Sequence, residues 1–229
     1  FLLIITLLIS VPLSTGAGIY LAEYAKKGHL TNFIRTCIEI LSSLPSVVVG
    51  LFGYLIFVVQ FGYGFSILSG ALALTVFNLP QMTRNVEDSL RHVHHTQREA
   101  GLALGLSRWE TILHVVIPEA LPGIVTGIVL ASGRIFGEAA ALIFTAGQSA
   151  PALDWSNWNP LSVTSPISIF RQAETLAVHI WKVNSEGTIP DATQVSAGSA
   201  AILLIFILLF NLSARYIGKK LHAKMTSAA

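Results

Sequence analysis

The chain has 229 residues, of which 53% are hydrophobic and 11% are charged, and its mean hydropathy is +0.67. Soluble domains carry about 25% charged residues, so this composition excludes an ordinary water-soluble protein and indicates a chain that lies mostly in a membrane. The net charge of +2 is too small to indicate nucleic-acid binding, and a single cysteine excludes a disulfide within the chain.

Five apolar segments are long enough to cross the hydrocarbon core, which requires a helix of roughly 20 residues. The predicted spans cover residues 1–21, 38–59, 65–83, 121–147 and 197–216. The sequence therefore predicts an all-α, polytopic membrane helix bundle that forms a single domain over residues 1–229. Two long connections separate the spans, one over residues 84–119 and the other over residues 148–196.

Basic residues gather after alternate predicted spans, and 11 of the 14 Lys and Arg residues follow this pattern. Cytoplasmic segments are enriched in Lys and Arg, so loop 84–119 and the C-terminus are predicted to be cytoplasmic and loop 148–196 external. The first residue would then lie outside, which predicts one more helix upstream and six in the natural protein. The clusters are Lys26, Lys27 and Arg35, then Arg84, Arg91, Arg98 and Arg108, then Arg215, Lys219, Lys220 and Lys224.

Glycine and proline residues within the spans predict details of packing. Gly123 and Gly127, and likewise Gly133 and Gly137, are four residues apart in the fourth span. Small residues at this spacing let two helix backbones approach closely in lipid. Pro45 in the second span removes a backbone hydrogen bond and predicts a kink there.

Residues 99–118 read EAGLALGLSRWETILHVVIP and lie in the predicted cytoplasmic loop. This segment resembles the coupling loop of ABC-importer permeases, written Glu-Ala-Ala, three residues, Gly, nine residues, Ile, one residue, Leu-Pro. Glu99, Ala100, Gly105 and Pro118 match this pattern, whereas Gly101, Val115 and Ile117 replace its second Ala, its Ile and its Leu.

The same segment predicts a short helix from about residue 97 to residue 104. Gly105 suits the left-handed turn that closes helices, and Ala100 and Gly101 leave room for a partner surface to approach. The resemblance implies that this rigid projection docks in a cleft of the ATPase subunit and transmits its closure to the spans. The alternative is an amphipathic helix that lies on lipid headgroups.

Four further stretches resemble phosphate permeases, and the order of the segments is most like the A-type of the two related subunits. They are IYLAEYAKKG at residues 19–28, LPSVVVGLF at 44–52, GRIFGEAAALIFTAG at 133–147 and SPISIF at 165–170. The resemblance implies import of inorganic phosphate across the bacterial cell membrane by alternating access. It also implies a second permease subunit, two ABC ATPase subunits and an external phosphate-binding protein as partners.

The chain has no Gly-x-x-x-x-Gly-Lys-Ser/Thr segment, so it does not bind ATP in the usual phosphate-binding loop. We therefore predict no enzyme activity, no catalytic residue and no cofactor in this chain, with ATP and Mg bound by the partner ATPase. His92, His94 and His95 are close in sequence, but their polar loop favours solvated side chains over a metal site.

Charged residues within the spans are candidates for the route of the anion. Arg134 and Glu138 are four residues apart, which predicts that they share one helix face. Each costs about 2.5–3.5 kcal/mol at the centre of a span, so a function or a structural ion pair must explain them. Arg84, at the cytoplasmic end of the third span, belongs either to this route or to the set of interfacial anchors.

Three other functions stay open at this point. An ABC permease for another oxyanion or small solute would share every feature above except the phosphate-permease segments. An ion-coupled secondary transporter would need inverted repeats and broken helices, and it leaves the spacing of residues 99–118 unexplained. A membrane-embedded enzyme would need a cluster of catalytic groups at one depth, where only Arg134 and Glu138 are found.

Overall fold

The computed structural model describes residues 1–26, 28–186 and 190–226, so Lys27 of the first basic cluster lies outside the described residues. Within these ranges all regular structure is helical. The helices are α1 (Leu2–Ile19), α2 (His29–Ser42), α3 (Ser46–Gly53), α4 (Ile67–Arg91), α5 (His95–Ala103), α6 (Arg108–Thr111), α7 (Ile117–Gly137), α8 (Ala140–Thr145), α9 (Leu176–Glu186) and α10 (Ala192–Thr226). Three wider, π-helical segments continue them: η1 (Tyr20–Tyr24) after α1, η2 (Tyr54–Gln60) after α3, and η3 (Ile112–Val116) between α6 and α7.

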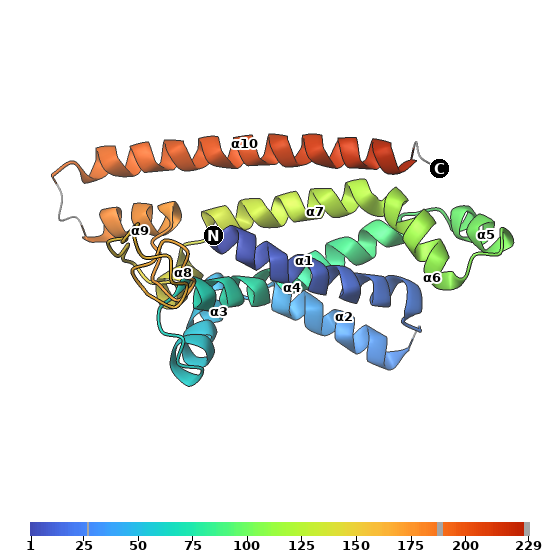
Figure 1. Ribbon diagram of the computed structural model, residues 1–229. Helices are drawn as coiled ribbons and strands as arrows, with labels where there is room; N and C mark the ends of the chain where they lie inside the picture. Colours follow the sequence, from blue (N-terminus) through green and yellow to red (C-terminus); the bar gives the residue numbers. More distant parts are fainter. Residues whose placement is uncertain (27, 187–189, 227–229) are drawn as a thin grey trace.

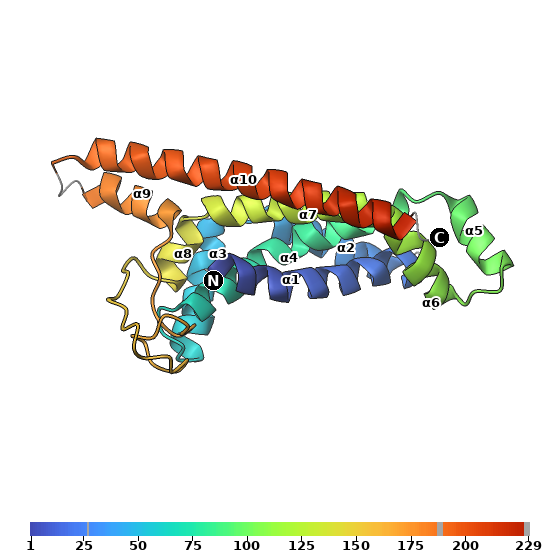
Figure 2. The ribbon, with the colours of Figure 1, turned by 45° about the horizontal axis from the view of Figure 1, so that its top comes forward.

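The long helices run side by side and give the molecule two distinct ends (Figure 1). The α5 end carries α5, α6 and the last turns of α10, whereas the α9 end carries α8, α9 and the N-terminus (Figures 1 and 2). Helix α4 is central and packs on α1, α2, α3, α7 and α8. Helix α10 packs on α7 and α9 and leaves most of its surface open.

The contact between α1 and α4 shows what these helices bury. The buried residues of α1 recur every fourth position from Leu2, and those after Leu2 are polar or small, namely Thr6, Ser10, Ser14 and Gly18. A Cβ atom at Gly18 would lie 2.6 Å from Cγ1 of Val86. Large side chains of α1, such as Leu8, are exposed instead. This pattern suits a helix in lipid, where close backbone approach holds helices together and large apolar side chains face the acyl chains.

Two of the four glycines predicted to pack closely do so. Added Cβ atoms would lie 2.6 Å from the Ser89 hydroxyl at Gly123 and 3.0 Å from Cβ of Asn85 at Gly127, so both glycines face α4. Gly133 and Gly137 face open space. The prediction is thus confirmed for the first pair, while the second pair makes no close contact with the described residues.

The predicted spans are confirmed in part. Residues 2–24, 108–137 and 192–220 form three helices that are long and apolar enough to cross a membrane. The second predicted span is wrong as a single helix, because α2 and the helix of residues 46–60 meet at 97°. The two helices form a fourth span only if the bent pair is counted as a single membrane crossing. The fourth predicted span ends early, since the chain leaves the helix at Glu138 before α8 begins.

The bend at Pro45 brings α3 onto α8, and Gly50 is the point of contact. A Cβ atom at Gly50 would lie 2.7 Å from Cα of Ala141 and 3.2 Å from its carbonyl oxygen. Backbone atoms block this position, so no rotamer change relieves the clash. Residue 50 therefore has to be glycine for α3 and α8 to pack as they do.

We expect Gly50→Ala to lower the thermal stability of the detergent-purified protein, because overpacking a tight contact costs about 1–3 kcal/mol. Gly16→Ala is the matched control, since Gly16 lies in α1 with nothing within 4 Å of an added Cβ. A helical Gly→Ala change there gains about 1 kcal/mol of helix propensity. Equal melting temperatures for the two variants would contradict the proposed contact.

Candidate functional site

Helix α5 forms the predicted short helix and projects at one end of the molecule (Figure 1). It ends as predicted at Gly105, whose φ of +83° is left-handed. The N–H of Gly105 donates to the Leu102 carbonyl at 3.0 Å, and that of Leu106 donates to the Gly101 carbonyl at 3.2 Å. These are the two hydrogen bonds of a Schellman motif, which turns the chain sharply out of the helix.

The turn after Gly105 folds α6 back onto α5, and the pair is called the coupling hairpin (residues 95–111) below. Gly101 is buried, and a Cβ atom there would lie 2.8 Å from Cγ2 of Thr111. The family pattern has alanine at position 101, and the close contact with Thr111 explains why this chain has glycine there. Ser107 and Glu110 form a capping box at the start of α6, and hydrogen bonds from the Ser107 hydroxyl, then from its backbone N–H, lower the pKa of Glu110.

The outer surface of the coupling hairpin combines apolar and small residues. Glu99, Ala100 and Gly105 are exposed there. Leu104 is 83% exposed, although it lies in a loop outside the long apolar helices. Leu102, Trp109 and Leu113 are also exposed. Such a patch beyond the spans fits a surface that another protein covers.

Arg98 anchors the coupling hairpin to the helix bundle. Its guanidinium donates to the Glu23 carboxylate at 2.8 and 3.1 Å, and to the carbonyl oxygens of Leu90 and Val93 at 2.6 Å each. The Glu23 side chain is only 9% exposed. Arg108, from α6, donates to the Glu23 carbonyl oxygen and lies over the ring of Tyr24. From their place in the sequence, these arginines were predicted only to be cytoplasmic charges, and no role was predicted for Glu23.

The last three residues of the family pattern lie where the coupling hairpin joins α7. Val115 and Ile117 are half-buried and Pro118 is buried in the first turn of α7. Pro118 has no backbone N–H to donate, and it closely follows the wider π-helical turn of η3 in a continuous helix. Val116 between them is fully buried. These residues therefore link the exposed hairpin to a long apolar helix rather than contributing to its outer surface.

A second buried carboxylate, Glu87, joins α2 to α4. It lies 2.9 Å from Arg35 and 3.0 Å from Arg91, and its side chain is 7% exposed. The charges at positions 84, 87 and 91 recur at helical spacing in α4, and this spacing is the sequence signal for such a network. Arg84 makes a more exposed contact with Glu39 of α2, at 3.4 Å.

Arg134 and Glu138 do not form the predicted pair. The Arg134 guanidinium donates to the side-chain oxygen of Gln81 and lies 4.0 Å from the ring centre of Phe77, both on α4. Glu138 lies beyond the end of α7, where its carboxylate accepts a hydrogen bond from the Ala141 N–H at 3.1 Å. The prediction of a shared helix face is wrong because α7 stops at Gly137, so Glu138 caps α8 instead.

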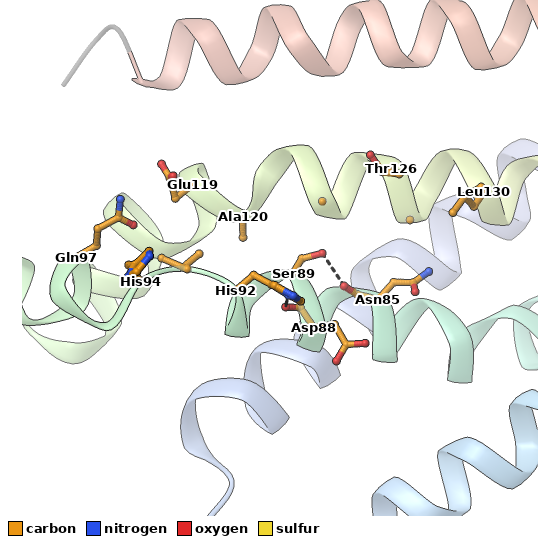
Figure 3. A pocket seen from close by; sticks show the side chains of 13 residues that line it. Asn85, Asp88, Ser89, His92, His94, Gln97, Glu119, Ala120, Thr126 and Leu130 are labelled. Atoms are coloured by element: carbon orange, nitrogen blue, oxygen red, sulfur yellow. Dashed lines mark hydrogen bonds between the residues drawn. The ribbon is translucent and has the colours of Figure 1, made fainter.

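A crevice of about 390 Å³ lies between the end of α4 and the start of α7 (Figure 3). Asp88, His92, His94 and Glu119 line it, and the Ser89 hydroxyl donates to the Asn85 carbonyl at 2.7 Å. Of the histidine group in the sequence, His95 lies apart, 3.1 Å from Glu99. The crevice thus lies between the polar end of α4 and the start of α7, and Gln97 of the coupling hairpin also lines it.

Residues 14–227 match the family of binding-protein-dependent transport system inner membrane components. The chain is 57% identical over 227 residues to the probable ABC transporter permease protein YqgI of Bacillus subtilis (strain 168), covering 99% of this chain and 77% of that protein. It is 39% identical over 217 residues to the phosphate transport system permease protein PstA of Yersinia pestis, covering 93% and 68%. The inward-facing MetNI methionine ABC transporter has the same fold, with a TM-score of 0.68 at 17% identity over 96% of this chain and 89% of that one.

The chain belongs to the family of binding-protein-dependent transport system inner membrane components and is the permease subunit of an ABC importer. Membership implies a multi-pass protein of the inner membrane that acts with a separate ATPase and a substrate-binding protein. It argues against the ion-coupled transporter and the membrane-embedded enzyme.

We expect Arg98→Gln to loosen the coupling hairpin, because removing one partner leaves the mostly buried Glu23 carboxylate unpaired. Hydrogen exchange of the amides at residues 95–103 is expected to accelerate by about tenfold or more. Arg84→Gln is the matched control, since an exposed ion pair contributes only about 0.2–1 kcal/mol. Unchanged exchange in α5 of the Arg98→Gln variant would show that the ion pair does not hold the hairpin.

Proposed function

We propose that this chain is the A-type permease subunit of an ABC importer that carries inorganic phosphate into a bacterial cell. The observation that supports the substrate best is the 39% identity to a phosphate permease over 93% of the chain. Arg134 supports it independently, since a guanidinium between two helices offers donors in the planar arrangement that phosphate oxygens accept.

In this proposal the α5 end faces the cytoplasm, and the coupling hairpin docks in a cleft of the ATPase. Two permease subunits, two ATPase subunits that bind ATP and Mg, and an external phosphate-binding protein complete the importer. The hairpin suits this role because it is compact, apolar on its outer surface and tied to α1, α4 and α7. Closure of the ATPase then moves these helices together, which is what alternating access requires.

Arg134 is the proposed contact for the anion within the membrane. It lines a small cavity of about 30 Å³, together with the side-chain amides of Asn78, Gln81 and Asn85 and the apolar residues Leu130 and Ala131. Amide groups replace part of the water shell of an anion without adding a negative charge. Glu138 and Arg84 lie nearer the α9 end and the α5 end, respectively, and remain candidates for the entrance and the exit.

We expect Arg134→Gln to reduce uptake of radiolabelled phosphate by at least about tenfold, which corresponds to about 1.4 kcal/mol in the transport barrier. Arg134→Lys, which keeps the charge but not the planar donors, is expected to retain part of the activity. Co-purification of the ATPase checks assembly, and Lys220→Gln controls for the loss of one positive charge. Normal uptake by an assembled Arg134→Gln importer would place the anion route elsewhere.

Gly105→Asp and Gly105→Asn form a matched pair that tests docking of the coupling hairpin. Both variants strain the backbone similarly at φ +83°, and nothing lies within 4 Å of the added Cβ. Only Asp adds a charge to the surface that has to meet the ATPase, so we expect it to abolish uptake and binding-protein-stimulated ATPase activity. Asn is expected to retain more of both activities, and equal activity of the two variants would contradict docking at this point.

A further inference from the structure

A separate cavity lies between α7 and α10 at the α5 end, with a volume of about 390 Å³. Three basic residues of α10 line one side, namely Arg215, Lys219 and His222. Pro122 and Val125 of α7 line the other side. The cavity is therefore cationic on one wall and largely apolar on the opposite wall.

The crossing of the two helices determines this shape. Gly218 is buried, and a Cβ atom there would lie only 2.5 Å from Cγ1 of Val125. Arg215, Lys219 and His222 recur at i, i+4 and i+7, so they share the face of α10 that meets α7. The close contact at Gly218 thus places long basic side chains on both sides of the crossing point.

Arg215 and Lys219 differ from three arginines near this end that contact buried carboxylates. Arg35 and Arg91 contact the carboxylate of Glu87, and Arg98 contacts that of Glu23. In the part of the chain that the structure describes, no carboxylate lies within ion-pair distance of Arg215 or Lys219, and none lines their cavity. Their positive charge is therefore available to an external anion.

The level of the cavity along α10 indicates the kind of anion. The apolar part of α10 ends at Lys220, so Arg215 and Lys219 lie in its last turns, where lipid headgroups begin. Leu208 and Leu212 precede Arg215 by about two turns and one turn, and both are exposed. A basic pocket continued by an exposed apolar stripe fits a lipid with an anionic headgroup and an acyl chain.

We propose that this cavity binds the phosphate headgroup of an anionic phospholipid, with Arg215 and Lys219 contacting the phosphate and an acyl chain lying along α10. The site is separate from the proposed substrate route at Arg134, and it does not depend on phosphate being the substrate. It also adjoins the coupling segment, since Nδ1 of His222 lies 3.2 Å from the carbonyl oxygen of Pro118. A bound headgroup therefore holds α10 against the start of α7, where the hairpin joins the bundle.

The test uses the purified importer in nanodiscs of phosphatidylcholine with or without phosphatidylglycerol. We expect phosphatidylglycerol to raise the melting temperature and to remain bound in native mass spectrometry. Lys219→Gln is expected to weaken its retention by about fivefold, because one basic residue near anionic headgroups contributes on that order. Lys220→Gln is the matched control, since it removes the same charge from the neighbouring position, which does not line the cavity.

Three results would overturn the proposal. Equal weakening by Lys219→Gln and Lys220→Gln would show a diffuse attraction to anionic lipid rather than a site. An absence of any difference between the two lipid compositions would show that no anionic lipid binds. If inorganic phosphate in phosphatidylcholine nanodiscs gives the same stabilisation, and Lys219→Gln removes it, the cavity binds a free anion instead.

Discussion

Close approach of helix backbones through small side chains is the constraint on which this bundle depends. In lipid, large apolar residues gain nothing by leaving the acyl chains for a neighbouring helix. The contacts therefore occur at Gly18 against α4, Gly50 against α8, Gly123 against α4 and Gly218 against α7. Large apolar side chains of α1 and α10, such as Leu8 and Leu208, remain on the outside, whereas the buried leucines, such as Leu74 and Leu142, cluster around α4 and α8. Polar and charged side chains buried between these helices therefore need hydrogen-bond or ion-pair partners on the same helices.

Buried carboxylates provide those partners at the α5 end. Glu23 holds the coupling hairpin through Arg98, and Glu87 holds α2 through Arg35. The hairpin is consequently attached to the bundle at three places: by an ion pair to η1, by hydrogen bonds from Arg98 to the end of α4, and by the continuous helix through η3 into α7. A body attached at several points moves with all of them, whereas a single flexible attachment would absorb the displacement. In the proposed function, these attachments transmit a movement of the ATPase to the spans.

The sequence predicts features of this fold that depend on local chemistry. The end of α5 at Gly105 needs only a residue that tolerates positive φ, and the contact at Gly123 needs only small residues on one face. The bend at Pro45 was predicted as a kink, but its size of 97° depends on the packing of Gly50 on α8, which are distant in sequence. The burial of Glu23 and Glu87 was missed for the same reason. A carboxylate in a basic segment looks solvated until the helix that covers it is known.

The environment of Arg134 changes the interpretation of the proposed anion route. A carboxylate one turn away would have neutralised the guanidinium and weakened its hold on an anion. Gln81 and Phe77 contact it instead, and neither carries a net charge. The guanidinium therefore attracts an anion more strongly than it would in a salt bridge with a carboxylate. Release in the proposed cycle therefore cannot rely on a local counter-charge. It requires α4 and α7 to move relative to each other, and both helices are connected to the coupling hairpin, α4 through Leu90 and Arg98 and α7 through η3.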